Sequence, residues 1–249
     1  MDNQTFLNVL KESFKTYLDP GTRGNKKLDG SRSNKKLKVL HGEIAKDIDN
    51  KIKNKNTDKT TVYTVSALGF GNSKEEKIQG RYYEKKVDIS IKENNEVKVA
   101  IGIKYVMSNY KQNSGNYFDL MLGETANIRS AGQKYFQVLI IPEKLPYFDK
   151  NGKITKWEII DKHHLEKYIK LSQDNKKQFY HTPDKTLLCI VHISEPKTEI
   201  KTKQDYINYY LHNDFSIQLS NKQFNFDCGV IFNDYEKFIN KVVFSVLSI

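Results

Sequence analysis

GRYYEKKVDISIKENNEVKVAIGIK, residues 80–104, is the stretch that decides the fold expected of this chain. Its β-branched residues alternate with polar ones on both sides of an asparagine-rich turn, which predicts paired strands at 85–92 and 97–106. The first strand carries an acid that is flanked by apolar residues, and the second ends in Gly-Ile-Lys. We therefore expect a β-hairpin with one polar face near the middle of the fold.

The register of this hairpin determines whether its polar residues meet. A common site requires Asp88, Gly102 and Lys104 on one face. A two-residue turn at 94–95 would place Asp88 on the wrong side, because side chains alternate along a strand. We therefore predict either a three-residue turn or a β-bulge that restores the pairing of Asp88 with Gly102.

Apolar spacing extends the expected fold in both directions from this hairpin. Alternating and continuous apolar runs predict further strands at 61–68, 135–142 and 185–193, and a hairpin that turns at 151–152. Helical spacing predicts helices at 1–18, 38–54, 116–130 and 162–172, and a final amphipathic segment that contains Tyr235 and Val243. This order predicts one domain over 1–249, an α/β/α sandwich with a central mixed β-sheet.

Composition sets limits on the class of protein. The 249 residues are 38% hydrophobic and 12% aromatic, which is enough for a core. No apolar run is long enough to cross a bilayer, and the N-terminus lacks the pattern of a signal peptide. Cys189 and Cys228 lie in apolar runs, so we expect buried thiols rather than a disulfide. These features predict a cytoplasmic protein without a membrane partner.

The formal charge of +11 favours a polyanionic partner, nucleic acid before an anionic membrane. A merely lysine-rich surface is the alternative. Cations in the segment 19–36 and amides in the loop 108–116 suit phosphates and base edges. The candidate DNA-binding residues are Arg23, Lys26, Lys27, Asn109, Lys111, Gln112, Asn113 and Asn116.

The polar face of the hairpin suggests phosphodiester chemistry. Hard oxygen ligands hold Mg²⁺, which acidifies water and screens the phosphate charge. A nearby lysine stabilises the charge of the transition state. Asp88 and Lys104 are therefore candidate catalytic residues, and Glu43 on the preceding helix is a candidate third group. The alternative is that Asp88 is an ordinary surface residue of an edge strand.

These motifs resemble the PD-(D/E)xK nuclease superfamily, and within it the type II restriction endonucleases, over about residues 38–142. The resemblance rests on HGEIAKDI with Glu43, KKVDISI with Asp88, VAIGIKYV with Lys104, and the following SNYKQNSGNYFDLMLGETANIR. It implies Mg²⁺-dependent, sequence-specific cleavage of double-stranded DNA by a homodimer. It also implies a restriction-endonuclease-like core over about 38–195, with metal ligands at Asp88, Glu43 and Ile103.

Gly102 departs from the family pattern, which places Glu there, so position 102 of the catalytic set is disabled. Inactivation of the chain is the favoured explanation, and a naturally dead or weakened homologue is another. The third is a substitute carboxylate such as Glu43, Glu84 or Glu124. The alternative functions are a non-catalytic DNA-binding protein on a nuclease scaffold and a structure-specific nuclease. The N-terminal helix and the C-terminal segment after residue 195 are expected to be additions to this core that serve DNA binding or dimerisation.

Overall fold

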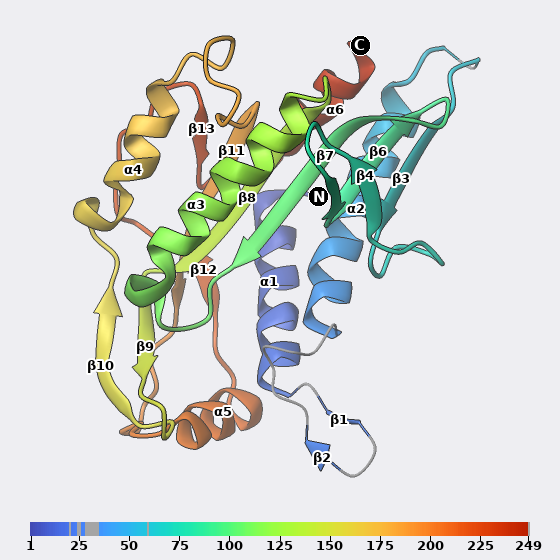
Figure 1. The fold of residues 1–249 in the computed structure, drawn as a ribbon. Coiled ribbons are helices and arrows are strands. Elements are labelled where there is room, and N and C mark those ends of the chain that lie inside the picture. Colours follow the sequence, from blue (N-terminus) through green and yellow to red (C-terminus); the bar gives the residue numbers. More distant parts are fainter. Residues whose placement is uncertain (20, 24–25, 28–34, 59, 249) are drawn as a thin grey trace.

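A mixed β-sheet forms the centre of the protein (Figure 1). The computed structural model describes residues 1–249 except 20, 24–25, 28–34, 59 and 249. Within this described part, seven strands form the sheet in the order β12-β11-β8-β7-β6-β3, and β13 also pairs with β11. The strands are β3 (Tyr63–Ala67), β6 (Ile89–Glu93), β7 (Glu96–Tyr105), β8 (Lys134–Pro142), β11 (Lys185–Ile193), β12 (Ile217–Leu219) and β13 (Val230–Phe232).

The middle of the sheet is parallel and its outer strands are mostly antiparallel. β8 pairs in parallel with β7 and β11, and β13 pairs in parallel with β11. β3, β6 and β12 join by antiparallel pairing. β8 and β11 are buried along almost their whole length, as expected for central parallel strands with continuous apolar sequence. The predicted strands at 135–142 and 185–193 are confirmed.

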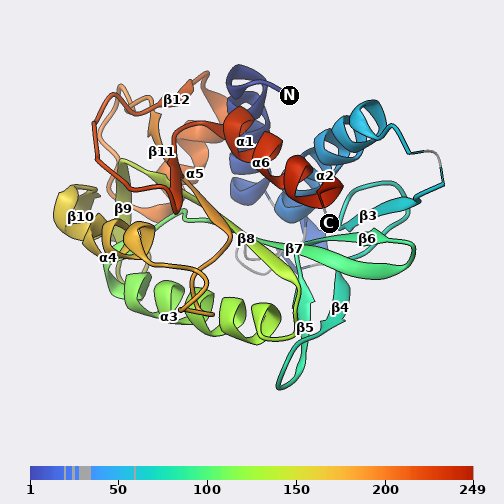
Figure 2. The same ribbon diagram turned by 90° about the horizontal axis from the view of Figure 1, so that it is seen from above.

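Helices cover both faces of the sheet, as Figure 2 shows. One face packs against α1 (Asn3–Leu18), α2 (Lys35–Lys55) and α6 (Tyr235–Leu247) in the largest core cluster. The other face packs against α3 (Tyr110–Arg129) and α4 (Lys162–Gln173). α5 (Lys203–His212) contributes Tyr206 and Tyr210 to the first cluster beside α1. The terminal helices, expected as additions, thus belong to the main hydrophobic core.

The β6–β7 hairpin has the pairing that the site requires. Its turn contains two residues, Asn94 and Asn95, both with positive φ (49° and 70°). A bulge next to the turn shifts the register between the pair Lys92–Val97 and the pair Ile91–Val99. The predicted three-residue turn is therefore wrong, and the alternative β-bulge is confirmed. Asparagine tolerates left-handed backbone well, which explains why this sequence accepts the tight turn.

The structure around the β6–β7 hairpin contains more strands and a longer helix than the sequence predicted. The predicted strand at 85–92 is split into β5 (Glu84–Val87) and β6, and β5 pairs with β4 (Glu76–Gln79), a strand that the sequence did not predict. Helix α3 begins at Tyr110, where the sequence predicted a loop up to residue 116. The hairpin of β9 (Lys144–Phe148) and β10 (Ile154–Ile159) has the predicted turn, with Gly152 at φ 79°.

Three other predictions from the sequence, on segment 19–36, on the cysteines and on membrane-spanning helices, can be compared with the structure. Segment 19–36, for which the sequence predicted no strand, contains two short antiparallel strands, β1 (Thr22–Arg23) and β2 (Lys26–Lys27), among its described residues. Both cysteines are free, but only Cys189 is buried, so the expected burial of Cys228 is wrong. No helix in the described part of the chain combines the length and apolar character needed to span a membrane.

Candidate functional site

Asp88 lies at the junction where strand pairing changes. The preceding strand β5 pairs with β4, whereas the following strand β6 pairs with β3 and β7. Because Ile89 pairs with Ile101, Asp88 comes opposite Gly102. Its carboxylate Oδ2 accepts a hydrogen bond of 2.6 Å from the backbone N–H of Ile103. This bond holds the side chain against β7 and leaves Oδ1 facing away from it.

Asp88 and Lys104 line one small cavity of about 140 Å³, so the structure brings these two groups together. Strand β8 and helix α3 close the cavity on its other sides. Among the residues that line the cavity are Asp88, Gly102, Lys104, Tyr117, Glu124, Tyr135 and Gln137. Ligand pockets for whole small molecules usually measure about 300–1,000 Å³. This cavity therefore suits a single phosphate group or hydrated ion better than a nucleotide base.

Lys104 lies at the exposed side of this cavity. Its ammonium is 4.3 Å from the centroid of the Tyr117 ring, a cation–π distance. Partial burial lowers the pKa of Lys104, and the neighbouring Asp88 carboxylate opposes this shift. The side chain is thus held against Tyr117 of α3 and remains available to an anion from solvent.

The space beside Gly102 is filled by residues of β8. A Cβ on Gly102 would lie 2.9 Å from Gln137 Oε1 and 3.1 Å from Tyr135 Cζ, and closer still to the Tyr135 hydroxyl oxygen. Tyr135 is fully buried, and its hydroxyl donates to Gln137 Oε1 at 3.1 Å. A glutamate at position 102 would therefore require Tyr135 to move.

Of the substitute carboxylates considered above, only Glu124 lines the cavity within the described structure. Burial raises the pKa of Glu124, although Lys85 lies 3.4 Å from its Oε2 and opposes the shift. Glu84 is 61% exposed and pairs with Lys77 at 3.8 Å. Glu124 is thus the one acid of the three that can act with Asp88.

Glu43 does not join the site. Its side chain is 47% exposed and pairs with Lys46 at 3.5 Å, on the same helix. Residues two apart on a helix point in roughly opposite directions, and His41 is the residue of α2 that faces Asp88. The proposal that Glu43 binds metal is not supported by this geometry.

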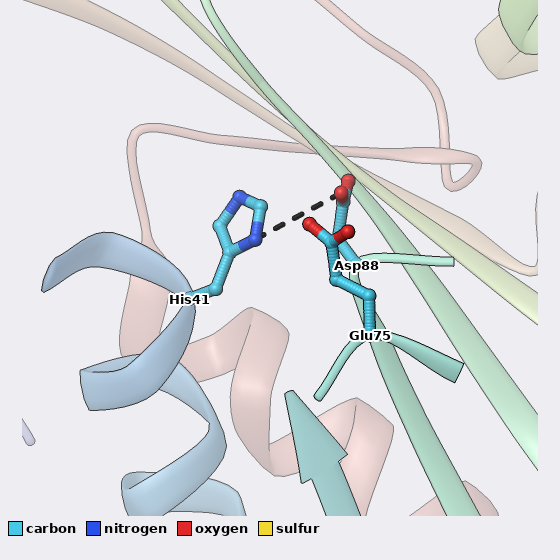
Figure 3. A group of neighbouring side chains, drawn as sticks. All are labelled: His41, Glu75 and Asp88. Atoms are coloured by element: carbon cyan, nitrogen blue, oxygen red, sulfur yellow. Dashed lines mark ion pairs between the residues drawn. The ribbon is translucent and has the colours of Figure 1, made fainter. Parts of the chain in front are cut away.

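His41, Glu75 and Asp88 form a cluster that sequence reasoning missed (Figure 3). One potential ligand atom from each side chain lies within 4.8 Å of the others. His41 Nδ1 is 3.8 Å from Asp88 Oδ1. Helix α2 brings the histidine here through close backbone packing, since a Cβ on Gly42 would lie 2.8 Å from the Gly69 carbonyl carbon. The HGE segment stands out in the sequence, but no local pattern indicates that Glu75 and Asp88 lie beside its His41.

Burial determines the charge of this cluster. Only 1% of the His41 side chain is exposed, and desolvation lowers its pKa from 6.5 despite the opposing carboxylates of Asp88 and Glu75. Desolvation also raises the pKa of Asp88, while His41 and the Ile103 N–H act in the other direction. At neutral pH the imidazole is therefore uncharged and has a lone pair to donate.

The Mg²⁺ ligand set implied by the resemblance is not assembled. Gly102 has no ligand atom, Glu43 lies elsewhere, and the described contact of Ile103 with Asp88 uses its N–H rather than its carbonyl. Magnesium requires near-octahedral oxygen ligands. The residues present do not fit that expected set, and the donors beside Asp88 are an imidazole and another carboxylate.

The candidate DNA-binding residues of α3 divide into structural and exposed groups. Asn109, in left-handed conformation before α3, exchanges hydrogen bonds with the backbone of Phe148, and Asn113 donates to the Asn109 carbonyl. Lys111, Gln112 and Asn116 are exposed. The exposed group is therefore the part of this set that can meet a partner surface, although Gln112 Oε1 already accepts a hydrogen bond from the Tyr147 hydroxyl.

The other candidates lie on the short paired strands β1 and β2. In these strands the backbone of Arg23 pairs with that of Lys26, and the backbone of Thr22 pairs with that of Lys27. The side chains of Arg23, Lys26 and Lys27 lie outside the described structure, and so do residues 24–25 and 28–34. Their expected contacts with DNA stay a prediction.

Comparison of the chain with protein-family models, with curated proteins and with solved structures finds no match. Local geometry is therefore the basis on which a function is assigned. That geometry comprises a small cavity between Asp88 and Lys104 and a buried His41–Glu75–Asp88 cluster, and Asp88 belongs to both.

Proposed function

We propose that this chain acts on duplex DNA as a metal-dependent endonuclease of the type II restriction class, on a restriction-endonuclease-like fold. The observation that supports the proposal most directly is the convergence of Asp88 and Lys104 on one cavity. An acid and a lysine that face a phosphate-sized space are the groups that phosphodiester hydrolysis needs. The charge of +11 favours a polyanionic substrate.

Each residue has a definite task in this proposal. Lys104 stands at the exposed side of the cavity, where its ammonium stabilises the charge that develops on the scissile phosphate. Asp88 is held by the Ile103 N–H, and Glu124 supplies a second acid from α3. Asp88 and the neighbouring donors His41 and Glu75 would hold a divalent cation, which would supply an acidified water and screen the phosphate charge. Cleavage of both strands implies a homodimer.

The filled space at Gly102 favours a second candidate, a non-catalytic DNA-binding protein that has kept a nuclease scaffold. Tyr135 and Gln137 occupy the position where the family has a carboxylate. In that case the chain binds duplex DNA with a steep dependence on salt and cleaves none.

A cleavage assay separates these functions. Supercoiled plasmid and a random duplex library would be incubated with the purified protein and Mg²⁺ or Mn²⁺. For the nuclease, Asp88→Asn and Lys104→Gln should each lower the cleavage rate by about 100-fold or more. Lys98→Gln is the matched control, because Lys98 is on the same strand but pairs with Glu96 at 2.7 Å.

The outcomes are distinct. Metal-dependent cuts at a fixed sequence, lost in both variants and kept in the control, support the endonuclease. Salt-sensitive binding without cleavage under any metal supports the binding protein. Cleavage that persists in Asp88→Asn and Lys104→Gln overturns the assignment of the cavity, and a preference for junctions or RNA indicates a structure-specific nuclease.

A further inference from the structure

We infer that His41, Glu75 and Asp88 bind a first-row transition-metal ion, such as Mn²⁺ or Zn²⁺, in preference to Mg²⁺. The site shares Asp88 with the proposed nuclease cavity, so the inference deepens that function and rests on it for its role in cleavage. The binding of the ion itself is measurable on the protein without DNA.

The three side chains converge from separate parts of the fold, as Figure 3 shows. His41 comes from α2, Glu75 from the residue just before β4, and Asp88 from the junction of β5 and β6. Their ligand atoms lie within 4.8 Å of one another. An ion about 2.1 Å from each donor spans roughly 4.2 Å between opposite ligands. The 3.8 Å gap between His41 Nδ1 and Asp88 Oδ1 is within that span.

The state of His41 Nδ1 points to a missing ligand. The side chain is 1% exposed, and this nitrogen has no hydrogen-bond partner among the described residues. A buried polar atom without a partner is energetically costly, so proteins rarely leave one. Because this atom faces two carboxylates, a cation satisfies all three groups at once.

Other histidine–carboxylate pairs of the chain make the contrast clear. His192 Nδ1 lies 2.7 Å from Glu143 Oε1, and His164 Nδ1 lies 2.6 Å from Asp161 Oδ1. Both are direct hydrogen bonds. The His41–Asp88 separation is too long for a hydrogen bond and leaves room for an ion between the two side chains.

The donor set selects the kind of metal. Imidazole suits zinc and other transition metals, whereas magnesium prefers oxygen ligands and retains its waters. One imidazole with two carboxylates therefore favours Mn²⁺ or Zn²⁺. The Ile103 N–H bond to Asp88 Oδ2 orients the carboxylate, as hydrogen bonds to metal ligands generally do.

Lys86 is the internal competitor for this site. Its ammonium forms an ion pair with Glu75 Oε2. The Lys86 side chain is 60% exposed, so it can turn to solvent when a metal takes the carboxylate. Removal of this cation should therefore strengthen metal binding, an effect that misfolding of a variant would not produce.

The test is titration calorimetry of the DNA-free protein with Mn²⁺, Zn²⁺ and Mg²⁺. We expect one Mn²⁺ per chain in wild type, and an affinity at least about tenfold lower in His41→Gln and Glu75→Gln, because even outer partners of metal ligands contribute about 10–100-fold. Lys86→Gln should bind more tightly. His192→Gln and Glu84→Gln are matched controls that should bind as wild type does. Circular dichroism establishes that each variant is folded.

Spin-echo spectroscopy of bound Mn²⁺ tests the imidazole directly, since nitrogen modulation should be present in wild type and absent in His41→Gln. Unchanged Mn²⁺ affinity in the two ligand variants, or Mg²⁺ bound as tightly as Mn²⁺, overturns the inference. Metal binding as expected without DNA cleavage rejects only the nuclease. Cleavage that is unaffected by both ligand variants rejects a role of this metal site in cleavage and leaves the nuclease standing.

Discussion

Replacing Gly102 by alanine should destabilise the protein, because residues of β8 already fill the space above it. The new Cβ would lie 3.1 Å from Tyr135 Cζ and closer to its hydroxyl oxygen. Overpacking of a core typically costs about 1–3 kcal/mol. The lower chain entropy of alanine in the unfolded state offsets about 0.4–1 kcal/mol. A net loss near 1.5 kcal/mol is expected.

Removal of the Tyr135 hydroxyl should relieve most of this cost. Tyr135→Phe alone loses one hydrogen bond to Gln137, worth about 1 kcal/mol. In the Tyr135→Phe background, Gly102→Ala should be nearly neutral. The double-mutant cycle should therefore give a coupling energy of about 1–2 kcal/mol.

The assay is urea unfolding of the four proteins, followed by circular dichroism at one pH. Gly123→Ala on α3 is the control, because nothing among the described residues lies within 4 Å of its added Cβ. That helical change should stabilise by about 1 kcal/mol. If the effects of Gly102→Ala and Tyr135→Phe add to within about 0.5 kcal/mol, Tyr135 does not fill the space and the reasoning is refuted. A coupled pair means that Gly102→Glu should be tested for cleavage together with Tyr135→Phe.

Other predictions concern the Glu143 carboxylate, the partly buried guanidinium of Arg129 and the exposed start of α3. Burial alone would raise the pKa of Glu143, but hydrogen bonds from Ser220 and His192 outweigh burial and lower the pKa below 4.5. The ionised carboxylate therefore stabilises the folded state above pH 4.5, and this stabilisation is lost on acidification. Denaturant midpoints should consequently fall more steeply below pH 4.5 in wild type than in Glu143→Gln, and parallel curves would contradict this. Arg129→Lys should cost about 1.5–3 kcal/mol in urea unfolding, since the guanidinium donates to several backbone carbonyls of the 176–182 loop; a change under about 0.5 kcal/mol would contradict it. Lys111→Gln should reduce the salt slope of log K for DNA binding by about 1 if this lysine meets phosphate, and an unchanged slope would place DNA elsewhere.

Several elements could be predicted because their signals are local. The apolar face of α1 and the unbroken apolar runs of β8 and β11 specify helix and buried strands without reference to the rest of the chain. The beginning of α3 shows the opposite case. Its polar residues follow no helical pattern, and tertiary bonds hold them in place, such as those from Lys111 N–H to Glu158 and from Tyr147 to Gln112.

The residues of the candidate site also fall into two groups, those that local sequence patterns indicated and those that only tertiary packing brought together. Strand periodicity in the sequence places Gly102 and Lys104 on one face, whereas Asp88 joins them only because a bulge shifts the register, which the sequence required for a site but did not itself establish. Only the tertiary structure decided that His41 and Glu75 reach Asp88 while Glu43 does not. Helix packing at Gly42 against Gly69 controls this choice. Contacts between distant segments depend on how whole elements pack, and no local pattern of residues encodes that arrangement.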